Sequence, residues 1–244
     1  MPLSSVQKKK ESRMKIDPIN WETVRESLQA NGFATLPQVL DPQECRHLVS
    51  MYDESERFRK TVVMERHGYG MGEYKYFTYP LPEPIQALRT AVYKAVAPVA
   101  NQWSSLLKLG IQYPDEHADF LEECHRNGQQ RATPLLLTYG KGGYNAMHQD
   151  LYGDVYFPLQ AVVFLSEPGV GYTGGEFVLT EQVPRAQSKA TVLAPKQGDL
   201  LIFTTQFRPK KSTRGYFRVT MKHGVSTIHS GNRYTLGIIF HDAK

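Results

Sequence analysis

Residues 135–150 read Leu-Leu-Leu-Thr-Tyr-Gly-Lys-Gly-Gly-Tyr-Asn-Ala-Met-His-Gln-Asp: an apolar run, a glycine-rich turn, and a histidine two residues before an aspartate. The run from Leu135 to Tyr139 has the length and composition of a buried strand. The turn at 140–143 lets the chain bend, because glycine adopts backbone angles that other residues avoid. In extended backbone, residues two apart point to the same face, so His148 and Asp150 can bind one metal ion from the end of a strand.

The sequence from Thr133 onward repeats this alternation of short strand-like runs and turns. The predicted strands are Leu135–Tyr139, Gln160–Leu165, Glu176–Thr180, Thr191–Leu193, Asp199–Thr204, Tyr216–Met221 and Arg233–Phe240. Seven or eight strands of this length predict a double-stranded β-helix, the jelly roll of cupin-like proteins. The expected fold class is therefore mostly β.

The residues before Thr133 show a different pattern, with apolar side chains at helical spacing. Trp21, Val24 and Leu28 form one such stripe, and residues 85–107 carry a longer one. Asp41, followed by a proline, is a predicted helix start, and residues 32–37 form one short extended piece. Because helices come first and strands second, we expect the helices to buttress one sheet of the jelly roll from outside.

This change of pattern gives the expected organisation of the chain. Residues 1–14 are polar and basic and are predicted to form a disordered tail. Residues 15–130 are expected to form a helical N-terminal support, and residues 131–244 the jelly-roll catalytic core. A length of 244 residues is typical of one structural domain that contains both parts.

The composition is that of a soluble globular protein, with 41% hydrophobic and 22% charged residues. No apolar run approaches the roughly 20 residues that span a bilayer, and the first residues lack the apolar stretch of a signal peptide. Cys45 and Cys124 form neither a disulfide framework nor a Cys-x-x-Cys metal pattern. We therefore expect a cytoplasmic protein without a membrane partner. The sequence does not indicate an oligomeric state.

Two imidazoles and one carboxylate hold non-haem Fe(II) and leave coordination positions open. His148 and Asp150 need a third ligand from a distant strand, and the candidates are His223, His229 and His241. A hairpin turn just after His229 places His223 deep in the barrel and His229 near its rim. His241 stands at the end of the chain, where a structural or exposed role is expected. The predicted metal ligands are therefore His148, Asp150 and His223.

Arg233 lies ten residues beyond His223, at the start of the last predicted strand. Strand alternation places Arg233, Thr235, Gly237 and Ile239 on one face and Tyr234, Leu236, Ile238 and Phe240 on the other. The apolar second set should pack between layers, which turns Arg233 toward the cavity. A buried arginine grips a carboxylate with two parallel hydrogen bonds. Iron, an open coordination position and a carboxylate-bearing co-substrate together indicate an oxygenase.

Basic residues near the predicted metal ligands suggest one kind of substrate. The net charge is +5, and the chain from Leu200 to His241 contains no acidic residue. Its basic residues are Arg208, Lys210, Lys211, Arg214, Arg218, Lys222 and Arg233. This excess either steers an anionic substrate such as nucleic acid, with Arg214 and Arg218 as contacts, or is solvated surface.

Residues 66–82 are rich in glycine, aromatic and basic residues and precede the predicted jelly roll. They are interpreted as a substrate lid in which Arg66, Tyr69, Tyr74 and Tyr76 contact a base or a peptide. The alternation of Tyr74 and Tyr76 fits one face of an edge strand equally well. The two interpretations are compatible.

Five motifs together resemble the Fe(II)- and 2-oxoglutarate-dependent dioxygenase superfamily. They are the run at 139–150, Gly174-Gly175-Glu176-Phe177, the Gly-Asp-Leu-Leu-Ile-Phe run at 198–203, His223-Gly224-Val225 and the Gly-Asn-Arg-Tyr-Thr-Leu run at 231–236. The resemblance extends from about Gly32 to the C-terminus. Prolyl hydroxylases share the Gly-Gly-Glu-Phe turn and the spacing from His223 to Arg233. Nucleic-acid repair enzymes of the AlkB type share His-Gln-Asp and a tyrosine nine residues before it. The chain as a whole is similar to a bacterial oxygenase family linked by similarity to oxidative repair of damaged DNA.

The resemblance implies Fe(II) as metal and 2-oxoglutarate and O2 as co-substrates. It assigns Fe(II) to His148, Asp150 and His223. It assigns the distal carboxylate of 2-oxoglutarate to Arg233, with Tyr139 as a hydrogen-bond partner, and Thr235 on the Arg233 face is a further candidate. AlkB-type enzymes carry an asparagine and an arginine where this chain has Thr235 and Ile239.

The implied reaction hydroxylates a substrate C–H bond while 2-oxoglutarate is converted to succinate and CO2. Hydroxylation of an N-methyl group releases formaldehyde, so the same chemistry serves oxidative demethylation. Alkylated nucleic acid is one candidate substrate, and the alternatives are a prolyl or other peptide and a small molecule. A non-catalytic cupin-like metal- or ligand-binding protein is the alternative from a different class, and it has no need of Arg233 as a carboxylate clamp.

Overall fold

The computed structural model describes residues 19–244, so the tail predicted at residues 1–14 lies outside the described residues. The helices are α1 (Trp21–Asn31), α2 (Pro42–Ser50), α3 (Glu83–Leu106) and α4 (His117–Arg126), with short 3-10 turns η1 (Met51–Asp53), η2 (Ser55–Arg57) and η3 (Met64–His67). Within residues 19–244, no helix has the length and apolar character needed to cross a membrane.

Two large antiparallel sheets and one small ribbon contain the strands. The seven-stranded sheet has the order β1 (Phe33–Leu36), β11 (Leu200–Thr204), β7 (Leu159–Phe164), β15 (Arg233–Ile238), β5 (Leu135–Tyr139), β4 (Glu73–Phe77) and β2 (Phe58–Val63). The six-stranded sheet has the order β10 (Lys189–Leu193), β9 (Phe177–Gln182), β13 (Gly215–Val225), β6 (Tyr144–His148) and β3 (Gly70–Met71), with β12 (Phe207–Ser212) paired to β13. The ribbon consists of β8 (Tyr172–Gly174) and β14 (Ile228–Gly231).

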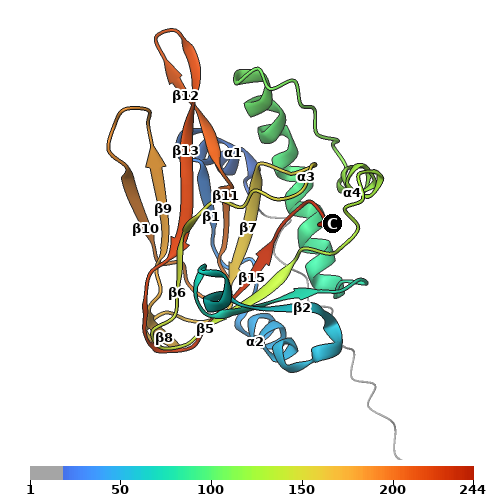
Figure 1. Cartoon of the computed structure of the whole chain (residues 1–244), viewed down its shortest axis with the longest axis vertical. Helices are drawn as coiled ribbons and strands as arrows, with labels where there is room; N and C mark the ends of the chain where they lie inside the picture. The colour runs from blue at the N-terminus through green and yellow to red at the C-terminus, as the bar shows by residue number, and fades with distance from the viewer. Residues whose placement is uncertain (1–18) are drawn as a thin grey trace, which may run out of the picture.

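The two large sheets face each other as a jelly roll, and helices cover the outer side of the seven-stranded sheet (Figure 1). The long helix α3 runs along this side, while the β9–β10 and β12–β13 hairpins project from the other side of the molecule (Figure 1). The predicted class, a mostly β jelly roll buttressed by N-terminal helices, is confirmed. The space between the sheets is the place where side chains from both of them can meet.

Strand alternation divides the buried apolar side chains into two main cores. Leu136, Val163 and Leu236 of the seven-stranded sheet pack with helix residues such as Val92 and Trp103. The core between the sheets consists of Val162, Phe164, Phe177, Leu179, Leu201 and Phe203. The apolar face predicted for the last strand therefore does pack under the helices, which leaves the Arg233 face turned toward the interior of the jelly roll.

The start of α2 forms as its sequence predicts. The Asp41 carboxylate accepts hydrogen bonds from the backbone N–H groups of Gln43 and Glu44, and Glu44 accepts one in return from the Asp41 backbone. Pro42 occupies the first helical turn, where its missing N–H costs nothing. This capping box directs the chain into the helix directly after β1 and its turn.

The N-terminal half contributes more strand than its helical spacing predicts. The strands β1 to β4 all come from the part of the chain expected to form a helical support. β4 pairs with β5 on one side and with β2 on the other, so Tyr74 and Tyr76 lie on an internal strand rather than on an edge strand. Residues 73–77 of the predicted lid are therefore fixed in the sheet by hydrogen bonds on both sides.

Arg89 on α3 fixes the chain that follows β15. Its buried guanidinium donates to the Ile239 and Phe240 carbonyls and, at 2.8 Å, to the Asp242 carboxylate. A buried charge pair persists only where such additional hydrogen bonds satisfy it. The contact matters for the site because Ile239 lines the cavity described below.

His117 on α4 makes the stability of the fold sensitive to acid. Its Nε2–H donates to the Phe240 carbonyl at 2.9 Å, and burial lowers its pKa from 6.5 to about 4. Between these values the unfolded chain binds a proton that the folded chain does not. The free energy of unfolding should therefore fall as the pH drops from about 6.5 to 4, by on the order of 3 kcal/mol.

The variant His117→Gln, which keeps a donor for the Phe240 carbonyl, should flatten this dependence in urea unfolding measured at several pH values across that window. Parallel pH dependences for wild type and variant would show that His117 is not the group responsible.

Candidate active site

His148 and His223 meet through the register of the six-stranded sheet. They are direct partners on β6 and β13, and their ring centroids are 4.2 Å apart. Asp150 follows β6, with Oδ1 3.5 Å from His148 Nε2 and Oδ2 3.4 Å from His223 Nε2. One ligand atom from each of the three side chains lies within 4.8 Å of the others. Strand pairing thus brings together the three side chains predicted as metal ligands.

Hydrogen bonds and packing fix the orientation of both imidazoles. His148 Nδ1 donates to the Ala146 carbonyl at 2.7 Å, since a carbonyl oxygen can only accept, and this leaves the lone pair on Nε2. His223 is buried between the Phe177 ring, which is parallel at 5.9 Å, and the Phe203 ring at 4.7 Å. The Nε2 atoms of both histidines face the Asp150 carboxylate.

Gln160 on β7 reaches across from the opposite sheet to this group. Its buried amide Nε2 donates to Asp150 Oδ2 at 2.7 Å and lies 3.3 Å from His223 Nε2. Burial alone would raise the pKa of Asp150. The hydrogen bond and charge of His223, the charge of His148 and the Gln160 amide together hold it well below its usual range. Burial and the neighbouring His223 lower the pKa of His148. Two imidazoles and one carboxylate are the donor set that suits a divalent transition metal.

Gln160 is expected to raise metal affinity without touching the metal. Gln160→Leu removes the amide that orients the Asp150 carboxylate, and loss of such an outer hydrogen bond typically costs about 10- to 100-fold in affinity. Titration with Fe(II) or Mn(II) under anaerobic conditions measures this directly. Gln206→Leu is the matched control, because the Gln206 amide donates to the Tyr156 hydroxyl instead. Equal metal affinity in wild type and Gln160→Leu would show that Gln160 does not contribute to metal binding.

Arg233 faces the same space from the seven-stranded sheet. It is the direct partner of Tyr139 across β15 and β5, and both side chains are 1% exposed. The guanidinium carbon lies 5.6 Å from the Tyr139 ring centroid and 5.3 Å from that of Phe164. Gly175, at a φ of +66°, leaves the room that the arginine needs, because a Cβ there would stand 3.0 Å from Arg233 Cδ. The pair His148–His223 in the six-stranded sheet and the pair Tyr139–Arg233 in the seven-stranded sheet thus form opposite walls of one site.

Arg233 lacks the partner that a buried charge requires. Among residues 19–244, its Nε and Nη2 have no hydrogen-bond acceptor, and burial lowers its pKa. Tyr139 stands beside it as a neutral phenol, because burial raises its pKa to about 12, and its oxygen accepts from Asn145 at 3.3 Å. A planar cation with two free donors and a phenol that keeps its proton fit the carboxylate of a co-substrate. The residues present therefore fit both a divalent metal and a carboxylate-bearing co-substrate.

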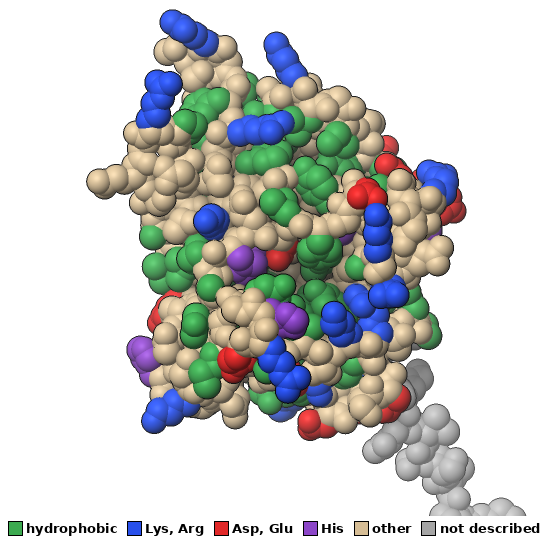
Figure 2. Space-filling model, viewed as in Figure 1, with side chains coloured by type: hydrophobic (Ala, Val, Ile, Leu, Met, Phe, Trp, Pro, Cys, Tyr) green, Lys and Arg blue, Asp and Glu red, His purple; other side chains and the backbone are tan. Residues whose placement is uncertain are grey.

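A cavity of about 510 Å³ joins the two walls. His148, Asp150 and Gln160 line it together with Arg233 and Thr235. Figure 2 shows a hollow near the centre of this face in which a histidine and an acidic side chain lie together, bordered by hydrophobic side chains. His148 and Asp150 are partly exposed, whereas His223 and Arg233 are buried. A co-substrate would therefore sit deep and a larger substrate would approach from the hollow.

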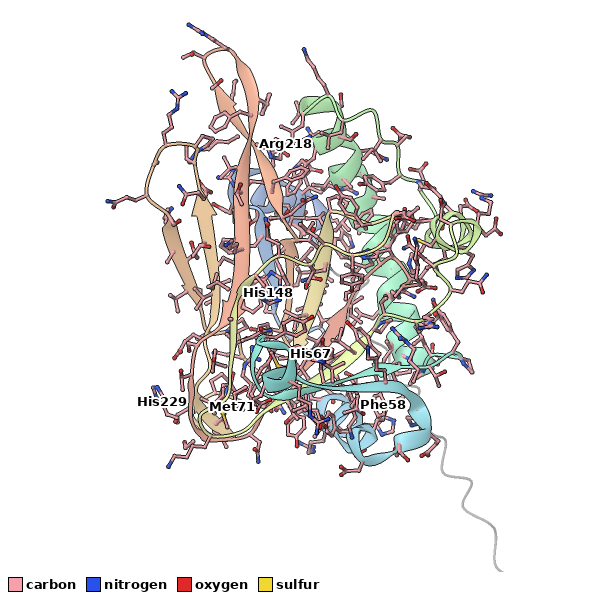
Figure 3. All side chains as sticks on the ribbon, in the orientation of Figure 1. Phe58, His67, Met71, His148, Arg218 and His229 are labelled. Carbon is pink, nitrogen blue, oxygen red and sulfur yellow. The ribbon has the colours of Figure 1, made fainter. Side chains whose placement is uncertain are left out.

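The side chains predicted as substrate contacts fall into two groups. Tyr69, Tyr74 and Tyr76 line the cavity, and Arg66 on η3 is exposed outside its lining. Arg214 and Arg218 lie on the projecting β12–β13 hairpin, where Arg218 stacks on a phenylalanine. At about 3.3 Å per residue, Arg218 stands roughly 17 Å from the metal-ligand group along β13. Figure 3 shows it well above His148.

The basic run does not form one continuous funnel. Arg208 and Lys210 form ion pairs with Glu181, and Arg233 is enclosed in the site. The remaining members, Lys211, Arg214, Arg218 and Lys222, are exposed. The anionic surface that these cations fit would lie outside the cavity.

Neither alternative histidine belongs to the metal-ligand group. His229 is exposed on β14, and Figure 3 places it at the margin of the molecule, away from His148. His241 is buried, and its Nδ1 accepts from the Phe157 backbone N–H at 3.2 Å. The preference for His223 agrees with this geometry.

Three site residues were missed from the sequence. Gln160 is the single polar residue in the buried strand Leu159–Phe164, and an isolated amide in such a run is a usable signal. Gln149 donates to the Gln206 and Met221 carbonyls and so anchors the residue between the two predicted ligands. Asn145 stands two residues beyond the glycine turn and reaches Tyr139. The partners of Gln149 are distant in sequence, whereas Asn145 and Gln160 contact side chains 6 and 10 residues away across turns and loops that their spacing does not reveal.

Solved structures place this jelly roll in a known class of fold. A prolyl-4-hydroxylase from Pseudomonas putida has a TM-score of 0.55 at 15% identity and covers 92% of this chain and 99% of its own. A 2OG-Fe(II) oxygenase family oxidoreductase from Burkholderia pseudomallei has 0.54 at 14%, covering 93% and 94%. A Trichoplax adhaerens prolyl hydroxylase, solved with a hypoxia-inducible-factor oxygen-degradation-domain peptide, has 0.53 at 15%, covering 90% and 87%. The fold is thus the one that 2-oxoglutarate oxygenases use.

The chain belongs to the Oxygenase-NA family, described as oxygenases catalysing oxidative methylation of damaged DNA, whose family model matches residues 72–243. It is also 48% identical over 167 residues to the uncharacterized proteins MT2286 and Rv2227 of two Mycobacterium tuberculosis strains, which covers 68% of this chain and 72% of each relative. The protein is therefore an oxygenase, as its sequence predicts, and not a non-catalytic cupin-like binding protein.

Proposed function

We propose that this oxygenase uses Fe(II), 2-oxoglutarate and O2 to hydroxylate alkylated nucleic acid, with N-methylated DNA as its substrate. The observation that carries the proposal is the buried Arg233 guanidinium, whose Nε and Nη2 find no acceptor among residues 19–244, across one cavity from His148, Asp150 and His223. An uncompensated buried charge is costly, so its presence requires an anionic partner in the working protein. A dicarboxylate that reaches from the metal to Arg233 supplies that partner.

Residues of the six-stranded sheet and the loop after it would bind the metal, and residues of the seven-stranded sheet would bind the co-substrate. His148, Asp150 and His223 would hold Fe(II) on one face and leave the opposite positions open. Arg233 and Tyr139 would hold the distal carboxylate of 2-oxoglutarate, with Thr235 beside them on the same face of β15. When bound, these groups would supply the activation of O2 that hydroxylates a substrate C–H bond as 2-oxoglutarate becomes succinate and CO2. The phenylalanines around His223 would exclude water from this step.

The choice of nucleic acid is supported by the family description and by two features of the surface. Exposed Lys211, Arg214, Arg218 and Lys222 on β12 and β13 provide cations for phosphates. Tyr69 at the cavity mouth is 50% exposed and stacks on His67 at 5.3 Å, a pair of ring faces of the kind that bind bases. Together with Arg66, these residues belong to the part of the predicted lid before β4, which pairs with β6 through the Tyr69 carbonyl and β3.

The reaction on an N-methyl group balances without a further reagent. One atom of O2 enters the methyl C–H bond, and the other enters succinate as CO2 leaves 2-oxoglutarate. The resulting hydroxymethyl amine breaks its C–N bond, which releases formaldehyde and returns the N–H form of the base. Succinate and formaldehyde should therefore form in equal amounts.

A substrate panel tests this proposal. Methylated single- and double-stranded oligonucleotides, their unmethylated counterparts, prolyl peptides and free amino acids are each incubated with enzyme, Fe(II), ascorbate and 2-oxoglutarate. The proposal expects succinate and formaldehyde in equal amounts with methylated oligonucleotides and neither above background with unmethylated ones. Succinate formation stimulated by prolyl peptides instead, with hydroxyproline as product, would replace nucleic acid by peptide as the substrate.

A further inference from the structure

One arm of the cavity is left unused by the proposed metal and co-substrate residues. Tyr74 and Tyr76 of β4 and Tyr152 of the loop after β6 line it, and we call it the tyrosine arm. The rings of Tyr74 and Tyr76 pack edge to face with centroids 5.4 Å apart. The arm is therefore a set of tyrosine side chains close to the predicted metal ligands.

The hydroxyl of Tyr152 is buried without a hydrogen bond. Its Oη has no partner in the described part of the chain. The ring of His241, with its centroid 5.1 Å from that of Tyr152, carries a second unpaired atom. Because His241 Nδ1 accepts from the Phe157 N–H, the proton is on Nε2, which finds no acceptor among residues 19–244. Unpaired buried polar atoms destabilise a fold. Tyr152 lines the cavity whereas His241 is not part of its lining, so the Tyr152 hydroxyl is the unpaired atom placed to meet a ligand.

The charges that line the cavity limit what this ligand can be. Within the described chain, Asp150 and Arg233 are the only Asp, Glu, Lys or Arg side chains of the lining. The proposed metal uses the first and the proposed co-substrate uses the second. Ile239 and Leu135 are apolar members of the same lining. Arg59, whose guanidinium carbon lies 4.6 Å from the Tyr76 ring centroid, donates to the Ala132 carbonyl and is not part of the lining. The lining of the tyrosine arm therefore offers no cation to a phosphate or a second carboxylate, and we expect the group that enters to carry no negative charge.

We propose that Tyr152 positions the substrate by a hydrogen bond from its hydroxyl, and that the tyrosine arm takes a planar group without negative charge, such as an alkylated base. This inference rests on the proposed function and identifies Tyr152 as the residue that binds and orients the reacting group. The faces of Tyr74 and Tyr76 suit a flat ring, whether neutral or cationic. The phosphates of the same substrate stay outside, where the exposed cations of β12 and β13 lie.

Tyr152→Phe tests the proposal with two measurements, the KM for the oligonucleotide and the melting temperature. Loss of a hydroxyl with only a structural role would leave this KM unchanged and lower the melting temperature. The KM for a methylated oligonucleotide should rise by about 3- to 10-fold, as expected for one lost hydrogen bond, while the KM for 2-oxoglutarate changes by less than about twofold. Without ligands, the melting temperature should stay equal to that of the wild type or rise by about 2–4 °C, because an unpaired buried hydroxyl has been removed. Tyr156→Phe is the matched control, since the Tyr156 hydroxyl in the same loop accepts from Gln206.

The remaining outcomes decide against the proposal or against the function beneath it. An unchanged oligonucleotide KM, or a lower melting temperature for Tyr152→Phe, overturns the role, because the hydroxyl is then idle or already satisfied by water. If the wild type turns over no methylated oligonucleotide, the proposed function fails. The melting comparison still decides, independently, whether the Tyr152 hydroxyl is unsatisfied. Efficient turnover of a substrate whose reacting group is anionic would overturn the charge argument.

Discussion

Asp150→Asn is expected to lower succinate formation from 2-oxoglutarate by at least about 1000-fold. The substitution keeps the size of the side chain and an oxygen that accepts from Gln160, but it removes the negative charge. Two neutral imidazoles and an amide bind a divalent metal far more weakly than two imidazoles and a carboxylate. The measurement is succinate release with Fe(II) and ascorbate, accompanied by the metal content of the purified protein.

A nearby aspartate provides the control for this variant. Asp154 lies four residues later, is exposed and pairs with Lys244, so Asp154→Asn should retain the activity of the wild type. Circular dichroism of both variants shows whether the fold is kept. Succinate formation by Asp150→Asn within about tenfold of the wild type would mean that Asp150 is not a metal ligand.

Arg233→Met is expected to raise the KM for 2-oxoglutarate by about 30-fold or more. Removing one partner of a buried, hydrogen-bonded charge pair costs about 2–5 kcal/mol, and each 1.4 kcal/mol is a factor of ten. The ligand-free protein should not lose stability, because the variant removes a buried guanidinium with two unpaired nitrogens. A thermal-shift titration with 2-oxoglutarate reports both effects, since a ligand raises the melting temperature only if it binds the folded state.

Two further variants serve as controls for this titration. Arg233→Lys keeps the charge but not the two parallel donors, so its KM should fall between those of the wild type and Arg233→Met. Arg218→Met, on the exposed part of β13, should leave the affinity for 2-oxoglutarate unchanged. A normal KM in Arg233→Met would place the co-substrate carboxylate elsewhere in the cavity.

The proximity of His148, Asp150 and His223 was predictable, because strand alternation and the position of one turn determine it. Strand alternation puts His148 and Asp150 on one side of an extended segment, and the same alternation turns Arg233 inward once its apolar neighbours are assigned to the helix-facing core. The choice of His223 over His229 needed only the position of a turn. These arguments use neighbours in sequence, which is the information that a single chain carries best.

The rest depends on contacts between separate strands and loops, which the order of the residues does not reveal. Gln160 reaches Asp150 from another sheet, and Tyr152 becomes notable only because nothing described pairs with its hydroxyl. The strand β6 was absent from the predicted strands, although His148 was expected in extended backbone, since its residues Tyr144–His148 are mostly polar or small and the preceding glycines favour a loop. The pairing of β4 between β2 and β5 was likewise not predicted, because the aromatic and basic composition of this segment was interpreted as that of a lid. In each case tertiary pairing outweighs the local preference.

The central claim is that one cavity holds a divalent metal on one sheet and a dicarboxylate between that metal and the other sheet. The most direct measurement is a crystal structure of the protein grown anaerobically with Fe(II) and 2-oxoglutarate. The account predicts iron bound by His148 Nε2, His223 Nε2 and a carboxylate oxygen of Asp150, with the far carboxylate of 2-oxoglutarate on the Arg233 guanidinium. Iron bound by other residues, or 2-oxoglutarate with neither carboxylate on Arg233, would contradict it.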